Sequence, residues 1–191
     1  MNIAQKAFCR VFQTAFHLAL PILPYREPKR YASIKDIITL CKEKNIKSIL
    51  LVTDRGLRSS GNTAALEALL KENRIHCAVY DSTCANPTVY NVEEARKIYI
   101  NEKCTALIAF GGGSSMDCAK AVGARIAYPK KSLGQLKGLL RVVRKIPTLI
   151  AIPTTAGTGS EVTVTAVITD SEKKHKYTMN DFTLIPSYAV L

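Results

Sequence analysis

The sequence lacks several features that would assign it to a class at once. Its 191 residues contain no tryptophan, only three histidines, and six cysteines without a C-x-x-C pair. Metal sites built from local motifs need ligands at short, fixed spacings, and no such spacing occurs here. Most of the cysteines fall inside apolar patterns, so we interpret them as reduced, buried thiols of a cytoplasmic protein.

The sequence also lacks an N-terminal segment suited to cross or enter a membrane. The run from Val11 to Leu23 is mostly apolar, but Gln13, Thr14 and His17 interrupt it. A bilayer span needs about 20 apolar residues, and a secretory signal needs a more uniform core and a small-residue cleavage site. The run therefore predicts an amphipathic helix that ends near Pro21, and we expect no membrane partner.

Acidic residues are scarce beside basic ones, at 15 against 27, which gives a net charge of +12. Such an excess favours nucleic acid or an anionic surface as a partner. The basic residues are dispersed, however, and even the densest region, 130–145, interleaves them with apolar residues as on a solvated helix face. We expect no nucleic-acid partner and attribute the excess to the field around an anionic cofactor.

Short apolar runs alternate with helical patterns along most of the chain. The predicted strands are 48–53, 77–80, 105–110 and 148–152, and the predicted helices are 33–44, 63–73, 92–101 and 118–127. This order predicts an α/β fold, a doubly wound, mostly parallel, Rossmann-like sheet with helices on both faces and right-handed crossovers.

The remaining segments complete the expected organisation. Residues 1–30 are expected to form a helix and a linker, and 31–191 the α/β domain. Residues 55–62 are interpreted as a loop. The β-rich runs 163–169, 177–179 and 189–191 are expected to close the edge of the sheet.

Three glycines and a serine, Gly111 to Ser114, stand where the third strand turns into a helix. Glycine can take φ > 0 and lets the backbone approach a ligand, while the N–H groups of a helix start point at an anion. Ser114 and Asp117 also form an S-x-x-D capping pattern. Because the stretch is not G-x-G-x-x-G, it is compatible with either a capped turn or a phosphate cradle.

Other polar residues follow the neighbouring strands. Asp54 and Asn86 stand after the first and second strands, and the hydroxyl-rich run from Pro153 to Glu161 stands after the fourth. Hydroxyls in such a run can bind ribose, amide or phosphate, or can simply form Ser/Thr turns. In a doubly wound fold these strand ends share the edge where ligands bind, so their coincidence with the glycines favours a nucleotide site.

Two motifs together resemble the iron-containing (group III) alcohol dehydrogenase family. The first is Gly111-Gly112-Gly113-Ser114-x-x-Asp117-x-x-Lys120, and the second is the run I-P-T-T-A-G-T-G-S-E-V-T at 152–163. The second motif is long and specific, and the resemblance extends from about Tyr31 to the last residue. In that family NAD or NADP lies across an N-terminal α/β domain.

By matched position, the resemblance implies a set of cofactor-binding residues. The glycine turn is expected to bind the pyrophosphate, and the threonines of the second motif to line the pyrophosphate, ribose and nicotinamide. The set consists of Asp54, Asn86, Gly111, Gly112, Gly113, Ser114, Asp117, Thr154, Thr155, Thr158 and Lys176. Asp54 ends the strand that faces the adenine ribose, where a carboxylate accepts hydrogen bonds from a free 2′-hydroxyl and repels a 2′-phosphate. We therefore expect NAD in preference to NADP.

The family's catalytic metal, Fe²⁺ or Zn²⁺, is held by one Asp and three His, two of them in a G-x-D-A-x-x-H-A helix. No such pattern occurs in this sequence. The resemblance therefore implies the cofactor-binding part of the enzyme, without the C-terminal helical metal domain, with no catalytic residue and no turnover of its own. For the complete enzyme it implies a small alcohol or aldehyde substrate and a homodimer or larger oligomer.

Three alternatives stay open at this point. A glycerol dehydrogenase or a dehydroquinate synthase belongs to the same superfamily, although the run at 154–161 favours the alcohol dehydrogenase branch. A catalytically inert nucleotide-binding module would act by partnering another chain. A nucleic-acid binder would show salt-dependent retention of DNA.

Overall fold

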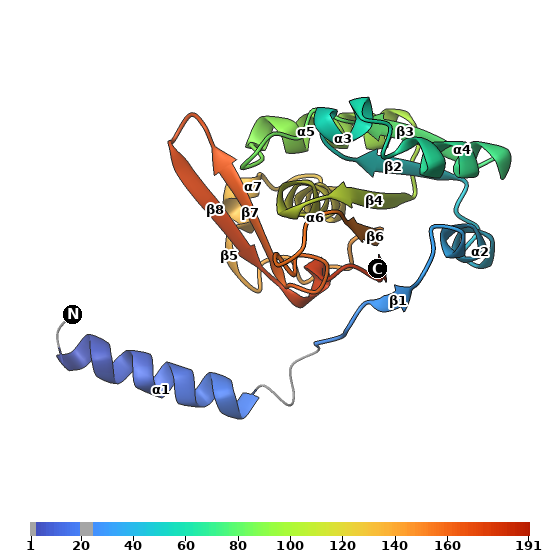
Figure 1. Ribbon diagram of the computed structural model, residues 1–191. Coiled ribbons are helices and arrows are strands. Elements are labelled where there is room, and N and C mark those ends of the chain that lie inside the picture. The colour runs from blue at the N-terminus through green and yellow to red at the C-terminus, as the bar shows by residue number, and fades with distance from the viewer. Residues whose placement is uncertain (1–2, 20–24) are drawn as a thin grey trace.

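A six-stranded parallel sheet forms the centre of the computed structural model, which describes residues 3–19 and 25–191 (Figure 1). All of its strand pairs are parallel. The hydrogen-bonded order is β1 (Lys29–Tyr31), β9 (Tyr188–Val190), β6 (Thr148–Pro153), β4 (Ala106–Gly111), β2 (Ser48–Val52) and β3 (His76–Tyr80). The α/β fold expected from the alternating pattern is confirmed.

Helices cover both faces of this sheet. In β2, Leu50 packs into a core with α5 (Val89–Asn101) and α6 (Gly113–Ala127), whereas Ile49 and Leu51 pack into a second core with α2 (Asp36–Glu43) and α4 (Ala64–Glu72). Successive strand residues point to opposite faces, so a strand between two cores must be apolar throughout. All six residues of β4 are buried accordingly.

The chain changes direction across the sheet between β2 and β4. From β2 it moves outward to β3 at one edge, and it then returns to place β4 on the other side of β2. The loops after β2 and β4 consequently leave the sheet toward opposite faces. A reversal of this kind opens a crevice at the carboxyl ends of the strands.

Two of the three C-terminal runs do not close the sheet as expected. β7 (Thr165–Asp170) and β8 (His175–Asn180) form an antiparallel hairpin in a separate small sheet with β5 (Gly138–Leu139). The residues of β7 alternate between buried and half-buried, so only one face of this strand is buried. That face packs against α6. β9 does join the main sheet, but between β1 and β6 rather than at its edge.

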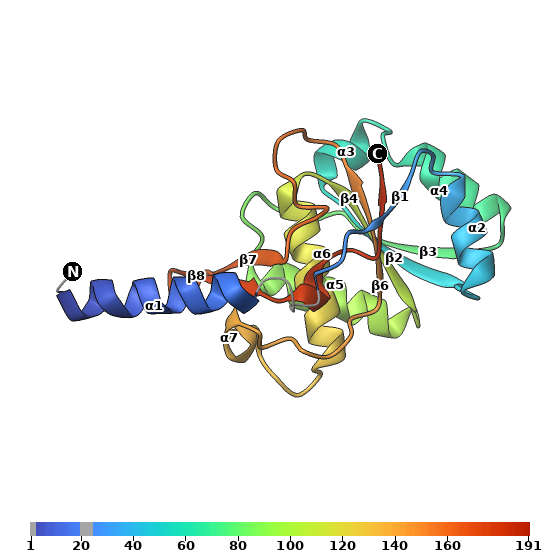
Figure 2. The ribbon, with the colours of Figure 1, turned by 90° about the horizontal axis from the view of Figure 1, so that it is seen from below.

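The N-terminal part begins with α1 (Ile3–Ala19), the helix that the sequence predicts. This helix projects away from the rest of the molecule in both views (Figures 1 and 2). Its expected end near Pro21 lies outside the described residues. The expected linker is wrong at its end, because Lys29 and Arg30 belong to β1 and pair with β9. The expected loop at 55–62 is also wrong in part, because α3 (Arg55–Ser59) occupies its first half.

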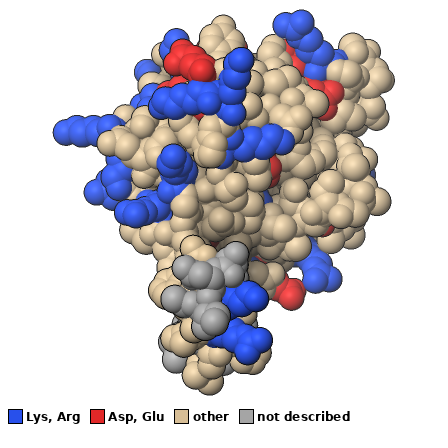
Figure 3. All heavy atoms as spheres, turned by 90° about the vertical axis from the view of Figure 1, so that its left-hand side faces the viewer, with Lys and Arg blue, Asp and Glu red and all other residues tan. Residues whose placement is uncertain are grey.

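Two short elements, α7 (Leu133–Leu136) and η2 (Phe182–Leu184), complete the chain. None of the helices in the described ranges has the length and apolar character needed to span a bilayer. On the face shown in Figure 3, Lys and Arg side chains are separated by other residues instead of forming one continuous patch.

Candidate cofactor site

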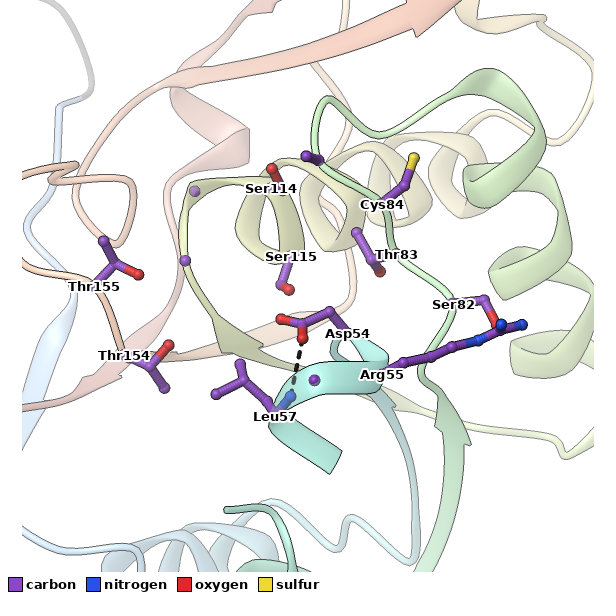
Figure 4. Close-up of a pocket in the computed structure, with 14 residues that line it drawn as sticks. Asp54, Arg55, Leu57, Ser82, Thr83, Cys84, Ser114, Ser115, Thr154 and Thr155 are labelled. Atoms are coloured by element: carbon purple, nitrogen blue, oxygen red, sulfur yellow. Dashed lines mark hydrogen bonds between the residues drawn. The ribbon is translucent and has the colours of Figure 1, made fainter. Parts of the chain in front are cut away.

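A cavity of about 850 Å³ opens at the carboxyl edge of the main sheet. Four loops line it, and each follows one of the parallel strands β2, β3, β4 and β6. The lining residues are 54–57, 82–85, 112–115 and 154–155. Figure 4 shows their side chains gathered around the start of α6. The cavity therefore stands at the reversal point of the strand order, where this fold binds ligands.

The glycine turn forms the wall between β4 and α6. Gly111 has φ 144°, a conformation that side-chain-bearing residues rarely adopt. A Cβ atom on Gly112 would stand 2.9 Å from Thr155 Oγ1, and one on Gly113 would stand 3.2 Å from Ser160 Oγ. The loop after β6 thus lies directly against the glycine turn. Side chains at these positions would push the loop away, so the close approach requires glycine.

The start of α6 corrects the expected capping pattern. The N-cap is Gly112, in an extended conformation and without a side-chain cap, so Ser114 is not the cap. Asp117 does not complete a capping box, because its Oδ2 accepts a hydrogen bond from Val167 N at 3.1 Å. The first N–H groups of a helix have no partner within it. At Gly113 to Ser115 these donors border the cavity, where an anion can accept from them.

Asp54 follows β2 and lines the cavity, and β4 lies between β2 and β6, the strand that leads into the second motif. Its Oδ1 accepts a hydrogen bond from Leu57 N at 2.9 Å and so caps α3 (Figure 4). This bond fixes the carboxylate beside the cavity and leaves Oδ2 as a further acceptor. Arg55 also lines the cavity next to it.

The loop after β3 is held by the buried side chain of Asn91. Its Nδ2 donates to Tyr80 Oη at 2.9 Å and to Ser82 O at 3.0 Å. Its Oδ1 accepts from Thr88 N at 2.9 Å, in a capping box at the start of α5. These bonds join both ends of the loop, so its cavity-lining residues are fixed to the sheet and to α5 at once.

The structure brings six of the eleven implied residues to the cavity wall: Asp54, Gly112, Gly113, Ser114, Thr154 and Thr155. Gly111 stands just before the wall and shapes the turn. Asn86, Asp117, Thr158 and Lys176 are not among the lining residues. Asn86 and Lys176 nevertheless meet, because Lys176 Nζ donates to Asn86 Oδ1 at 2.9 Å although 90 residues separate them.

Sequence reasoning did not single out several wall residues: Arg55, Gly56, Leu57, Ser82, Thr83, Cys84, Ala85 and Ser115. Residues adjacent to Asp54 and Ser114 could have been found by extending those positions along the chain. The residues at 82–85 match no binding motif, and only their position after β3 indicates that they lie at the cavity edge of the sheet.

The described part of the chain contains no group of three His, Cys, Asp or Glu residues that could hold a metal ion. We therefore assign no metal chemistry to these residues. Burial raises the pKa of the Cys77 and Cys118 thiols to about 12. Both remain protonated at neutral pH and are unsuited to act as nucleophiles.

The sheet order and the position of the cavity are those of the doubly wound α/β proteins, which bind ligands at this edge. The chain belongs to the iron-containing alcohol dehydrogenase family, which it matches over residues 30–191. The resemblance carried by the two sequence motifs is thereby confirmed.

Individual relatives support this membership. The chain is 42% identical to a choline dehydrogenase of Bacillus subtilis over 134 residues, which are 69% of this chain and 33% of that protein. It is 35% identical to an NAD-dependent methanol dehydrogenase of Bacillus methanolicus, over 83% of this chain and 42% of that one.

Solved structures agree with the sequence comparisons. A 1,3-propanediol oxidoreductase matches with a TM-score of 0.80 and 31% identity, over 87% of this chain and 44% of that one. A sulfoacetaldehyde reductase of Bifidobacterium kashiwanohense in complex with NAD⁺ matches with a TM-score of 0.72 and 26% identity, over 87% and 45%. The chain thus spans less than half the length of these relatives.

Proposed function

We propose that this chain is the cofactor-binding part of an NAD-dependent, metal-dependent alcohol dehydrogenase that interconverts small alcohols and aldehydes. The observation that carries the proposal is the cavity wall where the start of α6, the bare glycine turn (111–114) and the loop after β6 (residues 154–162, the threonine loop) meet. Membership of the iron-containing alcohol dehydrogenase family supports the reaction class. When bound, NAD supplies the hydride acceptor or donor.

The glycine turn is suited to the pyrophosphate of NAD. The N–H groups of Gly113, Ser114 and Ser115 lie at a helix start, where they and the helix dipole favour a negative charge. The side chains of Ser114, Ser115 and Thr155 line the same cavity (Figure 4). A dianionic diphosphate can accept hydrogen bonds from both sets of donors, whereas added Cβ atoms would fill the space.

Asp54 is suited to the adenine ribose. Because Oδ1 is engaged by Leu57 N, the carboxylate is oriented, and its other oxygen can accept from a ribose hydroxyl. A 2′-phosphate at this place would meet the negative charge. We therefore attribute the preference for NAD over NADP to the Asp54 carboxylate.

The threonine loop completes the proposed site on the nicotinamide side. Thr154 N donates to Gly111 O at 3.1 Å, so the loop begins in contact with the glycine turn. In the complete enzyme a divalent metal would act as a Lewis acid on the alcohol. Since the described residues offer no metal cluster, we expect the 191-residue chain by itself to oxidise neither ethanol nor butanol. We also expect it to bind NAD weakly.

Calorimetric titration of NAD, NADH and ADP into the purified chain tests the proposal. All three share the diphosphate and adenosine moieties, so each is expected to bind at one common site. A Gly113→Ala variant, whose methyl group would stand 3.2 Å from Ser160 Oγ, should bind NAD about tenfold more weakly. Gly134→Ala is the matched control, because its nearest neighbour is Tyr177 Oη at 3.5 Å, an ordinary contact away from the cavity.

Absence of binding by all three nucleotides would contradict the proposal. Equal NAD affinities in the Gly113→Ala and Gly134→Ala variants would show that NAD does not bind at the glycine turn. Salt-dependent retention of duplex DNA without competition from NAD would support the nucleic-acid alternative instead.

A further inference from the structure

The helix that starts at the glycine turn carries a lysine with no exposed surface. Lys120 is 0% exposed and is among the largest fully buried side chains described. Lysine is almost never fully buried unless its ammonium group is paired, because burying a charge is costly. Burial lowers the pKa of Lys120 to about 8, although Asp117 and Glu161 act in the opposite direction. An apolar side chain would fill this space without that penalty.

The ammonium group of Lys120 makes three directed hydrogen bonds. Nζ donates to Thr163 O at 2.8 Å, to Thr163 Oγ1 at 2.9 Å and to Thr165 O at 3.0 Å. A protonated lysine has three N–H donors, so all of them are satisfied. The acceptors belong to Thr163, which precedes β7, and to Thr165, the first residue of β7.

Asp117, one turn earlier on α6, holds the same segment. Its Oδ2 accepts from Val167 N at 3.1 Å. β7 is the edge strand of the small sheet, so one row of its backbone groups has no partner strand. Asp117 and Lys120 provide side-chain partners for that row at residues 165 and 167, and Pro87 O accepts from Thr169 N further along.

The hydrogen bonds from Lys120 and Asp117 hold the chain just beyond the C-terminal end of the threonine loop. Residues 154–162 connect β6 to the anchored segment and place Thr155 and Ser160 against the glycine turn. At its other end the loop is tied by Thr154 N to Gly111 O. α6 therefore offers N–H donors to the cavity at its first turn and fixes the opposing loop through side chains one and two turns later.

We propose that Lys120, assisted by Asp117, is a positioning residue that holds the 154–162 loop against the glycine turn and thereby sets the affinity for the cofactor. This inference rests on the proposed function, since it concerns the same site. Lys120 itself touches neither the cavity nor the cofactor; it acts through the loop.

Three single variants of the 191-residue chain test this role. Lys120→Met keeps an unbranched side chain of similar length but removes the three donors. Thr163→Val leaves the ammonium group in place but removes one of its acceptors, together with the hydrogen bond that Thr163 Oγ1 donates to Ser160 O at 3.4 Å. Lys71→Met is the control, because Lys71 is exposed on α4. We expect NAD affinity to fall about tenfold in Lys120→Met, to fall less in Thr163→Val and to stay unchanged in the control.

Cleavage by a glutamate-specific protease gives a second readout that does not need the cofactor. The loop contains Glu161, whereas Glu72 at the end of α4 reports on the remainder of the fold. Release of the loop should accelerate cleavage after Glu161 about fivefold in Lys120→Met while cleavage after Glu72 keeps its rate. A general loss of stability would accelerate both.

The outcomes separate this inference from the proposed function. Wild-type NAD affinity and an unchanged Glu161 cleavage rate in Lys120→Met would overturn the positioning role. If that variant does not fold, Thr163→Val decides by the same two measurements. If the wild-type chain binds no NAD, the proposed function fails, and the Glu161 and Glu72 rates still decide whether Lys120 holds the loop.

Discussion

Replacing Gly111 by alanine should destabilise the chain through two separate effects. Its φ of 144° is strained for any residue with a side chain, at about 1–3 kcal/mol. The added Cβ would also stand 2.6 Å from Ser115 Oγ and 3.2 Å from Leu57 Cδ1, and overpacking of this kind costs about 1–3 kcal/mol. Together we expect a loss of about 3 kcal/mol, which lowers Tm by about 6–12 °C in a chain of this size.

Differential scanning calorimetry measures this loss, and Gly61→Ala separates its two parts. Gly61 also has a positive φ, 79°, but a Cβ there would meet nothing within 4 Å. That control should lose only the backbone contribution, about 1 kcal/mol. Adding Ser115→Ala to Gly111→Ala removes the closest contact and should recover part of the difference. If Gly111→Ala loses no more stability than Gly61→Ala, the close packing of the glycine turn is refuted.

Three further predictions concern Asp54, Lys120 and Asn91. Asp54→Gly should reduce the preference for NAD over NADP in paired calorimetric titrations, because the carboxylate that repels a 2′-phosphate is gone; an unchanged preference would contradict its assigned role. The pKa of Lys120 is lowered from 10.5 to about 8 in the folded chain, so between these values the unfolded chain binds more protons. The unfolding free energy of the wild type, measured in urea against Lys120→Met, should therefore rise across this pH window, and a flat difference would show that the lysine does not titrate there. Asn91→Leu should cost about 2–4 kcal/mol in the same assay, because it leaves Tyr80 Oη and Ser82 O without their shared donor; a loss below 1 kcal/mol would refute the role of Asn91 in holding the loop.

The main sheet could be predicted from the sequence because its strands are buried on both faces. Runs such as 106–110 are apolar at every position, and they are separated by helical patterns. The alternation of strands and helices then predicts a parallel sheet, whose polar strand ends share one edge. The glycine turn could be located for the same reason.

The strand partners of the chain ends could not be predicted in this way. β1 has only three residues, and its partner β9 is at the other end of the sequence, so no local pattern connects them. The sequence of β7 and β8 would show the same strand pattern in either sheet. That the hairpin forms a second sheet, and does not extend the first, is seen only from its packing against α6.

The sequence motifs predicted several residues of the cavity wall, but they did not indicate which side chains hold another segment in place. Gly112, Gly113 and Thr155 were placed by their motifs. Asp117 and Lys120 belong to the same motif, but the structure directs both side chains to the segment before and within β7. Helical spacing alone does not show which element covers that side of α6.

We propose that the start of α6 and the glycine turn bind the diphosphate of NAD. Titration of NAD into ¹⁵N-labelled chain, followed by two-dimensional NMR, tests it at single amides. We expect the largest shifts at the amides of Gly112, Gly113, Ser114 and Ser115, and smaller shifts at Thr155. Saturating shifts that leave these amides unmoved and cluster elsewhere, or no shifts at all, would contradict it.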